Sequence, residues 1–209
     1  MYIPKNFLTT DQDEIISFIT QYSFGTIITA KANHPTATHL PFLISKREDK
    51  VILTSHFAKA NLQWEDLEEN TILVIFNEPH AYISPKHYEK ELNVPTWNYF
   101  SVHAYGHANL ITEENQTFDV LEATINNYEI GYKQQWDNLP QDYKVKLVKG
   151  IVAFEIVVTD LQAKKKLSQN KSEAEQNKII DSLSLSEDKN ERDVAKYMEQ
   201  DILKNKDYI

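Results

Sequence analysis

The sequence contains no cysteine among its 209 residues. Disulfide bridges, thiolate metal sites and cysteine nucleophiles are therefore excluded. No apolar run approaches the roughly 18 residues that a membrane-spanning helix needs, and the mean hydropathy is −0.51. The first five residues, MYIPK, lack the charged and then apolar profile of a signal peptide, so we expect a cytoplasmic protein that does not bind membranes.

Glycine is also scarce, with only four residues in the chain. None of them stands in a G-x-G-x-x-G or G-x-x-x-x-G-K-[ST] pattern, so glycine-rich phosphate loops are absent. A bound phosphate must then be held by side chains or by ordinary helix and strand ends. Positive charge is limited as well, because 22 Lys and Arg face 31 Asp and Glu and give a net charge of −9. This balance argues against an extended nucleic-acid interface, and direct DNA binding is not expected.

The pattern of apolar residues predicts an α+β protein of one domain with an appendage. Strands are expected at 26–31, 36–46, 51–55, 71–76, 96–112 and 150–161. Helices are expected at 11–24, where Thr9 or Thr10 is the cap and Gly25 the stop, and at 58–69, 118–128, 143–148, 172–183 and 187–205. Short connections between strands, interrupted by single helices, predict a small and mostly antiparallel barrel. We place the barrel at 1–162 and a C-terminal loop with helices at 163–209.

The first polar cluster stands where the third predicted strand runs into a helix. Its members are Thr54, Ser55, His56, Lys59 and Asn61. Two hydroxyls, an imidazole and an amine beside the free N–H groups of a helix start suit a phosphate monoester. The simpler interpretation is that Ser55 caps the helix while His56 and Lys59 lie on a solvated face.

The second candidate is the segment 94–107. In a strand, its odd-numbered residues from Trp97 to His107 share one face, which mixes aromatic bodies with polar tips. Such a face suits a flat polar ring, although a sheet face packed under a helix would show the same pattern. His103 and His107 would lie about 13 Å apart, too far to share an ion. No metal site is predicted.

The third candidate is the basic triplet 164–166 and the polar residues that follow it up to Lys171. The ordinary interpretation is an exposed loop before a helix, since Ser172 and Glu175 form a capping-box pattern. No G-x-S-x-G elbow or catalytic dyad is present. Residue types alone therefore indicate no reaction.

Six segments taken in order resemble the PaiB family of FMN-binding negative transcriptional regulators, which is related to the pyridoxamine-phosphate-oxidase-like split barrels. They are 1–4, 39–42, 55–61, 81–85, 94–99 and 166–171. The resemblance covers the chain from Met1 to about Leu183 and leaves out the last helix. It implies a split β-barrel with peripheral helices and a helical C-terminal tail, which binds FMN at the interface of a homodimer.

The resemblance also implies roles for single residues. It assigns the phosphate end of FMN to Thr54, Ser55, His56, Lys59 and Asn61. It assigns the strand beside the isoalloxazine to Thr38, His39 and Leu40. Further cofactor contacts are assigned to Trp97, Lys166, Ser168, Gln169 and Asn170. The last four are expected to close over the ring from the partner subunit. Related oxidases bind the phosphate with a strand-borne arginine, but neither Arg47 nor Arg192 is suitably placed, so His56, Lys59 and the helix start must substitute.

We expect an indirect regulatory role, exerted through the flavin or through protein contacts, because no helix-turn-helix is evident. One alternative is an FMN-dependent oxidoreductase acting on a small molecule. Others are a heme-binding protein, which would need an axial ligand in the pocket, and an interaction protein without a cofactor.

Overall fold

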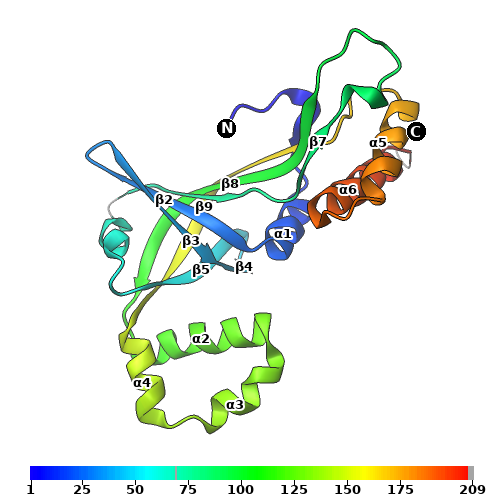
Figure 1. Ribbon diagram of the computed structural model, residues 1–209. Coiled ribbons are helices and arrows are strands. Elements are labelled where there is room, and N and C mark those ends of the chain that lie inside the picture. The colour runs from blue at the N-terminus through cyan, green and yellow to red at the C-terminus, as the bar shows by residue number, and fades with distance from the viewer. Residues whose placement is uncertain (69, 207–209) are drawn as a thin grey trace. The chain divides into compact units, whose positions relative to one another are not determined.

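The computed structural model describes residues 1–68 and 70–206 and is of the α+β class (Figure 1). Its strands are β1 (Leu8–Thr9), β2 (Phe24–Lys31), β3 (His34–Pro41), β4 (Leu43–Arg47), β5 (Lys50–Ala58), β6 (Ile72–Phe76), β7 (His80–Ile83), β8 (Thr96–Ile111) and β9 (Ile151–Lys166). Its helices are α1 (Gln12–Gln21), α2 (Glu114–Tyr128), α3 (Lys133–Asn138), α4 (Gln141–Lys149), α5 (Glu173–Ser184) and α6 (Lys189–Lys206). Short 3-10 helices are η1 (Lys5–Phe7), η2 (Leu62–Asp66), η3 (Pro85–His87) and η4 (Ile130–Tyr132).

The chain forms two compact units. The barrel unit comprises Ile16–Phe76 and His103–Leu161, and the second unit, here called the α5/α6 unit, comprises Met1–Ile15, Asn77–Val102 and the chain from Gln162 onward. The long strands β8 and β9 each contribute one part to either unit. Residues 163–209, which the sequence suggests as a separate part, thus share a unit with two earlier segments.

The barrel unit has the strand order β3-β2-β6-β8-β9-β5-β4, and β2, β4 and β5 pair antiparallel with their neighbours. The Oγ of Ser55 on β5 donates to the carbonyl of Pro41 at the end of β3, 2.6 Å away, which joins the first strand of this order to the last but one. Where β8 approaches β9, a Cβ on Gly106 would lie 2.4 Å from the Val157 carbonyl oxygen, so only glycine fits. The predicted antiparallel barrel is confirmed.

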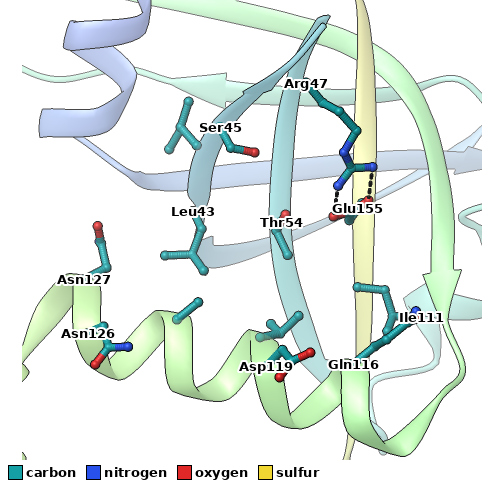
Figure 2. Close-up of a pocket in the computed structure, with 13 residues that line it drawn as sticks. Leu43, Ser45, Arg47, Thr54, Ile111, Gln116, Asp119, Asn126, Asn127 and Glu155 are labelled. Atoms are coloured by element: carbon teal, nitrogen blue, oxygen red, sulfur yellow. Dashed lines mark hydrogen bonds and ion pairs between the residues drawn. The ribbon is translucent and has the colours of Figure 1, made fainter. Parts of the chain in front are cut away.

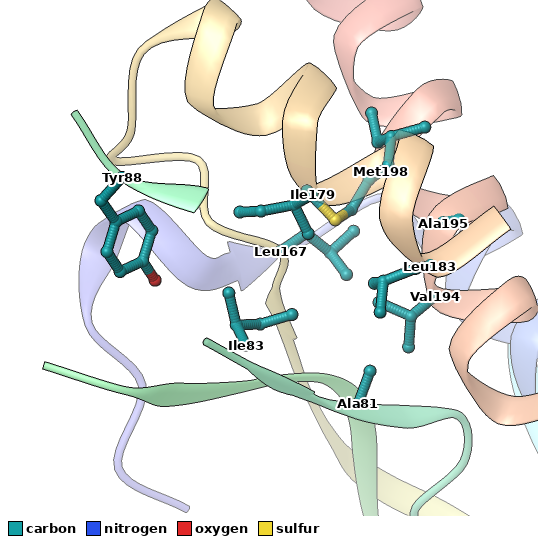
Figure 3. Packing of buried hydrophobic residues seen from close by; sticks show 10 residues of the cluster. Ala81, Ile83, Tyr88, Leu167, Ile179, Leu183, Val194, Ala195 and Met198 are labelled. Carbon is teal, nitrogen blue, oxygen red and sulfur yellow. The ribbon is translucent and has the colours of Figure 1, made fainter. Parts of the chain in front are cut away.

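The α5/α6 unit is built on strand pairs β1–β9 and β7–β8. The side chains in Figure 3 belong to its buried apolar cluster, in which Ala81 and Ile83 of β7 are packed with Leu183 of α5 and Val194 of α6. Helix α5 begins with the predicted capping box of Ser172 and Glu175, which is confirmed. The last helix, whose role the sequence left open, therefore contributes directly to this core.

Five predicted boundaries were wrong. Strand 36–46 is divided at the buried Phe42 into β3 and β4, and Gly25 lies within β2 instead of ending a helix. The cap of α1 is Asp11, whose carboxylate accepts from the N–H groups of Asp13 and Glu14. Strand β9 continues to Lys166 because β1 pairs with its last residues. The basic triplet is thus part of a strand and not of a loop.

The fifth wrong boundary concerns the first polar cluster. Strand β5 runs on to Ala58, since its pairing with β9 extends to Ile151 and the N–H of Lys59 donates to the Gly150 carbonyl at 2.8 Å. The predicted helix 58–69 is replaced by two turn residues and the short η2, and Glu69 lies outside the described residues. Thr54, Ser55 and His56 consequently lie inside a strand, and no α-helix start supports them.

Candidate functional site

The alternation of β5 separates the three predicted residues that it carries. Ser55 is 3% exposed, and its hydroxyl donates a hydrogen bond to the Pro41 carbonyl. Thr54 and His56 are half-buried on the opposite face of the strand. Ser55 therefore joins strands, while Thr54 and His56 remain as candidates for a ligand.

Lys59 follows the end of β5 and is exposed. Within residues 1–68 and 70–206, the side chains of Thr54, His56 and Lys59 make no hydrogen bond or ion pair. Burial lowers the pKa of His56, so the imidazole is mainly neutral at pH 7. One hydroxyl, one imidazole and one ammonium thus stand along one stretch of chain with their bonding capacity unused.

Asn61 and Thr38, in contrast, are tied to each other. The Asn61 amide donates to the Thr38 hydroxyl at 2.9 Å, and that hydroxyl donates to Oε1 of Gln63 at 2.6 Å. The Gln63 amide in turn donates to the Thr36 carbonyl at 3.1 Å, and only 4% of Gln63 is exposed. This network fastens η2 to β3. Sequence reasoning missed Gln63 because its importance arises from a contact between distant segments.

Replacing Gln63 by alanine should lower the free energy of unfolding by about 2–3 kcal/mol, because buried partners would lose their hydrogen bonds. Urea unfolding of the two proteins measures this. Glu65→Ala is the matched control, since Glu65 is an exposed residue of the same short helix. An equal effect of the two substitutions would contradict the role given to the network.

His39 and Leu40 lie on β3, beside β2. His39 is exposed, and its ring stacks on Phe24 with centroids 6.3 Å apart and an interplanar angle of 22°. Phe24 itself is 66% exposed. Leu40 is half-buried opposite Gly25. The His39 and Phe24 rings therefore offer a flat surface of the kind an aromatic ligand uses.

A pocket of about 860 Å³ adjoins Thr54 between strands β4, β5 and β9 and helix α2 (Figure 2). Arg47 lines this pocket, so this arginine lies nearer to the candidate site than the sequence indicated. Its guanidinium is bound by the Glu155 carboxylate through two hydrogen bonds of 2.9 and 3.1 Å. Sequence reasoning missed the pocket because α2 is distant from β4 and β5 along the chain.

The predicted residues of the loop after β9 belong to the α5/α6 unit. The Lys166 amine donates to the Thr96 hydroxyl and to the Trp97 carbonyl. Ser168, at a φ of 62°, donates to Asn98 at 3.0 Å, and the Gln169 amide donates to the Lys165 carbonyl at 2.6 Å. Asn170 is exposed. The loop is therefore fixed by its own contacts, and Asn170 is its most accessible polar side chain.

An aromatic face accompanies this loop. Trp97 is 51% exposed and meets His80 and Tyr82, each with ring centroids 5.8 Å away. Lys164 lies over the ring of Tyr99 at 5.4 Å and makes no ion pair with any described residue. The predicted alternation of β8 is confirmed, since its even-numbered residues from Asn98 to Ala108 are buried. Among the odd-numbered residues from Trp97 to His107, only Ser101 is buried, being 4% exposed.

The predicted site residues thus fall into one set in each unit. In the barrel unit, the free donor set of Thr54, His56 and Lys59 matches the chemistry of a phosphate monoester, which takes hydrogen bonds and positive charge. The exposed rings of His39 and Phe24 match a flat aromatic group. The residues present therefore fit the two ends of a flavin mononucleotide.

Residues 1–160 match the family model described as "Putative FMN-binding domain". A Bacillus subtilis relative, "Protease synthase and sporulation protein PAI 2", is 41% identical over 207 residues, which are 98% of this chain and 99% of that protein. The chain belongs to the PaiB family. FMN is accordingly the cofactor of this PaiB-family protein.

Solved structures support the split-barrel fold. The flavocytochrome Anf3 of Azotobacter vinelandii superposes with a TM-score of 0.62 at 15% identity, covering 79% of this chain and 72% of that one. The FAD and heme binding protein of Mycobacterium smegmatis gives 0.60 at 13% identity, covering 76% and 73%. Among the described residues, none of the helices combines the length and apolar character needed to cross a membrane.

Proposed function

We propose that this PaiB-family protein holds the phosphate of FMN with Thr54, His56 and Lys59. The observation that carries the proposal is that these three side chains stand free along the end of β5. Ser55 and Asn61 act differently, because their bonds to Pro41 and Thr38 fix the strand and the turn that carry the donor set. Bound FMN supplies the redox-active ring, which the protein chain itself lacks.

The ring end is proposed to lie at His39 and Leu40, with Thr38 positioning the strand through its bond to Asn61. We propose a homodimer in which Trp97, Lys166, Gln169 and Asn170 of the partner subunit cover the ring, while the buried Ser168 fixes their loop through its bond to Asn98. The half-exposed Trp97 and the accessible Asn170 support this assignment. The fixed shape of the loop also supports it, since a preformed cover costs little entropy on binding.

We propose that the protein acts as a cytoplasmic regulator through its flavin or through protein contacts. The net charge of −9 supports an indirect effect, because direct DNA binding needs a positively charged surface. The alternative remains an FMN-dependent oxidoreductase of a small molecule.

Titration of FMN with the purified apoprotein tests the proposal. We expect quenching of flavin fluorescence at a stoichiometry of one FMN per chain, with weaker binding of riboflavin, which lacks the phosphate. Absence of FMN binding over the micromolar range would overturn the proposal. Adding NAD(P)H to the complex then separates the roles, since rapid and catalytic bleaching of the flavin would favour the oxidoreductase.

FMN binding should raise the pKa of His56. Burial holds this pKa below its usual 6.5 in the free protein, whereas a nearby phosphate dianion favours the charged imidazolium. NMR titration of the His56 ring, free and with saturating FMN, measures the difference. Riboflavin is the control and should leave the pKa unchanged. An equal shift with both ligands would place the phosphate elsewhere.

A further inference from the structure

The pocket beside Thr54 is larger than the phosphate group of FMN requires. Its volume is about 860 Å³, which lies in the range of pockets that enclose a whole small-molecule ligand. Thr54 lines it and also belongs to the proposed phosphate site. We propose that this pocket takes the adenylate half of FAD, so that the protein binds FAD as well as FMN. This inference rests on the proposed function, because it requires the flavin phosphate to lie at Thr54.

The connectivity of FAD places its second half at this position. FAD extends FMN through its phosphate, which becomes one half of a pyrophosphate linked to adenosine. Whatever follows the phosphate must therefore begin beside Thr54. The pocket continues from there along β4, through Leu43 and Ser45, to α2. Figure 2 shows Leu43 and Thr54 on the strands that lie opposite this helix.

The charged groups of the pocket are Arg47, Glu155 and Asp119, and of these the arginine suits a second phosphate. Arg47 gives two of its five N–H donors to Glu155 and keeps three for another acceptor. Glu155 holds the guanidinium in place, so little side-chain freedom is lost when an anion binds. A single phosphate at Thr54, His56 and Lys59 leaves these three N–H groups unused, whereas the second phosphate of a pyrophosphate could accept from them.

The rest of the lining suits an adenosine. Asn126 and Asn127, neighbours near the end of α2, present amide groups, which can donate to and accept from the edge of an adenine. The Asp119 carboxylate can accept from ribose hydroxyls, and it has no partner among the described side chains. Leu43 and Val120 provide apolar walls for the base. All three parts of an adenylate thus find matching groups.

The test compares FAD, FMN and riboflavin binding by wild type and by Ala123→Trp. Ala123 lines the pocket on α2, and a tryptophan there would fill the space of the adenosine. We expect wild type to bind FAD within about tenfold of FMN, and Ala123→Trp to weaken FAD about 30-fold while FMN binding stays within about twofold. Asn115→Trp, which adds the same ring to an exposed position of α2 outside the pocket, is the control.

Retention of FMN binding shows that the variant is folded. If it does not fold, Asn126→Ala with Asn127→Ala replaces it, with an expected loss of about tenfold for FAD alone. Wild type that binds FMN but not FAD would overturn the inference and leave the proposed function intact. Equal effects of Ala123→Trp on both flavins would also overturn it. Wild type that binds neither flavin would overturn the proposed function and this inference with it.

Discussion

The variant with His56 and Lys59 both replaced by alanine should bind FMN about 100-fold more weakly than wild type, while riboflavin binding stays within about twofold. A hydrogen bond to a charged group contributes about 1.5–3 kcal/mol, and a factor of ten in affinity corresponds to about 1.4 kcal/mol. Losing two such contacts therefore costs at least a hundredfold. Riboflavin makes neither contact, because it has no phosphate.

Fluorescence titration of each flavin with each protein gives the four dissociation constants. The matched control replaces His34 and Lys50, a histidine and a lysine that are exposed at the starts of β3 and β5 in the same unit. It removes the same two residue types and should leave both affinities unchanged. If the His56 and Lys59 variant weakened both flavins equally, these residues would contact the ring or maintain the fold instead.

The elements that the sequence specified well are those whose pattern is local. The alternation of β8 from Trp97 onward survives in the structure because each residue's side is set by the strand period alone. The start of α5 was likewise predictable, since the Ser172 capping box satisfies its own backbone groups. Such features need no distant partner, and the sequence therefore contains all the information that determines them.

The end of β5 depends on a distant partner. Residues 56–58 continue the strand because they pair with 151–153 of β9, about a hundred positions later. Local residue types around Lys59 favour a helix, and the tertiary pairing overrides that preference. The same reason explains why Lys164, which was predicted to lie in a loop, lies in a strand, since it pairs with Leu8 of β1.

In the candidate site, too, the local residue types were predictable, whereas the contacts with distant segments were not. The residue types at Thr54, His56 and Lys59 predicted a phosphate site, and these three side chains have no hydrogen-bond or ion-pair partner among the described residues. Which of the polar residues stay free, however, was decided by partners at Pro41 and Gln63. The pocket beside Thr54 is formed by segments some seventy residues apart in the sequence, and no sequence motif predicts it.

Replacing Phe42 by alanine should lower the free energy of unfolding by about 3–5 kcal/mol, the usual cost of removing a buried phenyl group. Phe42 is fully buried, and its ring meets those of Phe76 and Phe154 edge-on at 5.7 and 6.4 Å. It also occupies the corner between β3 and β4, where its carbonyl accepts a hydrogen bond from the Tyr128 hydroxyl. The surrounding strands are held at this corner and can fill the cavity only in part.

Phe24→Ala is the matched control, because it deletes the same ring from a side chain that is 66% exposed. Its effect should stay within about 0.5 kcal/mol, as for most surface substitutions. Urea unfolding followed by tryptophan fluorescence measures both variants. A loss of less than about 1 kcal/mol for Phe42→Ala would mean that the core relaxes around the missing ring. The β3–β4 corner could then move freely, and it would not hold His39 and Thr54 in the fixed positions that the proposed flavin site requires.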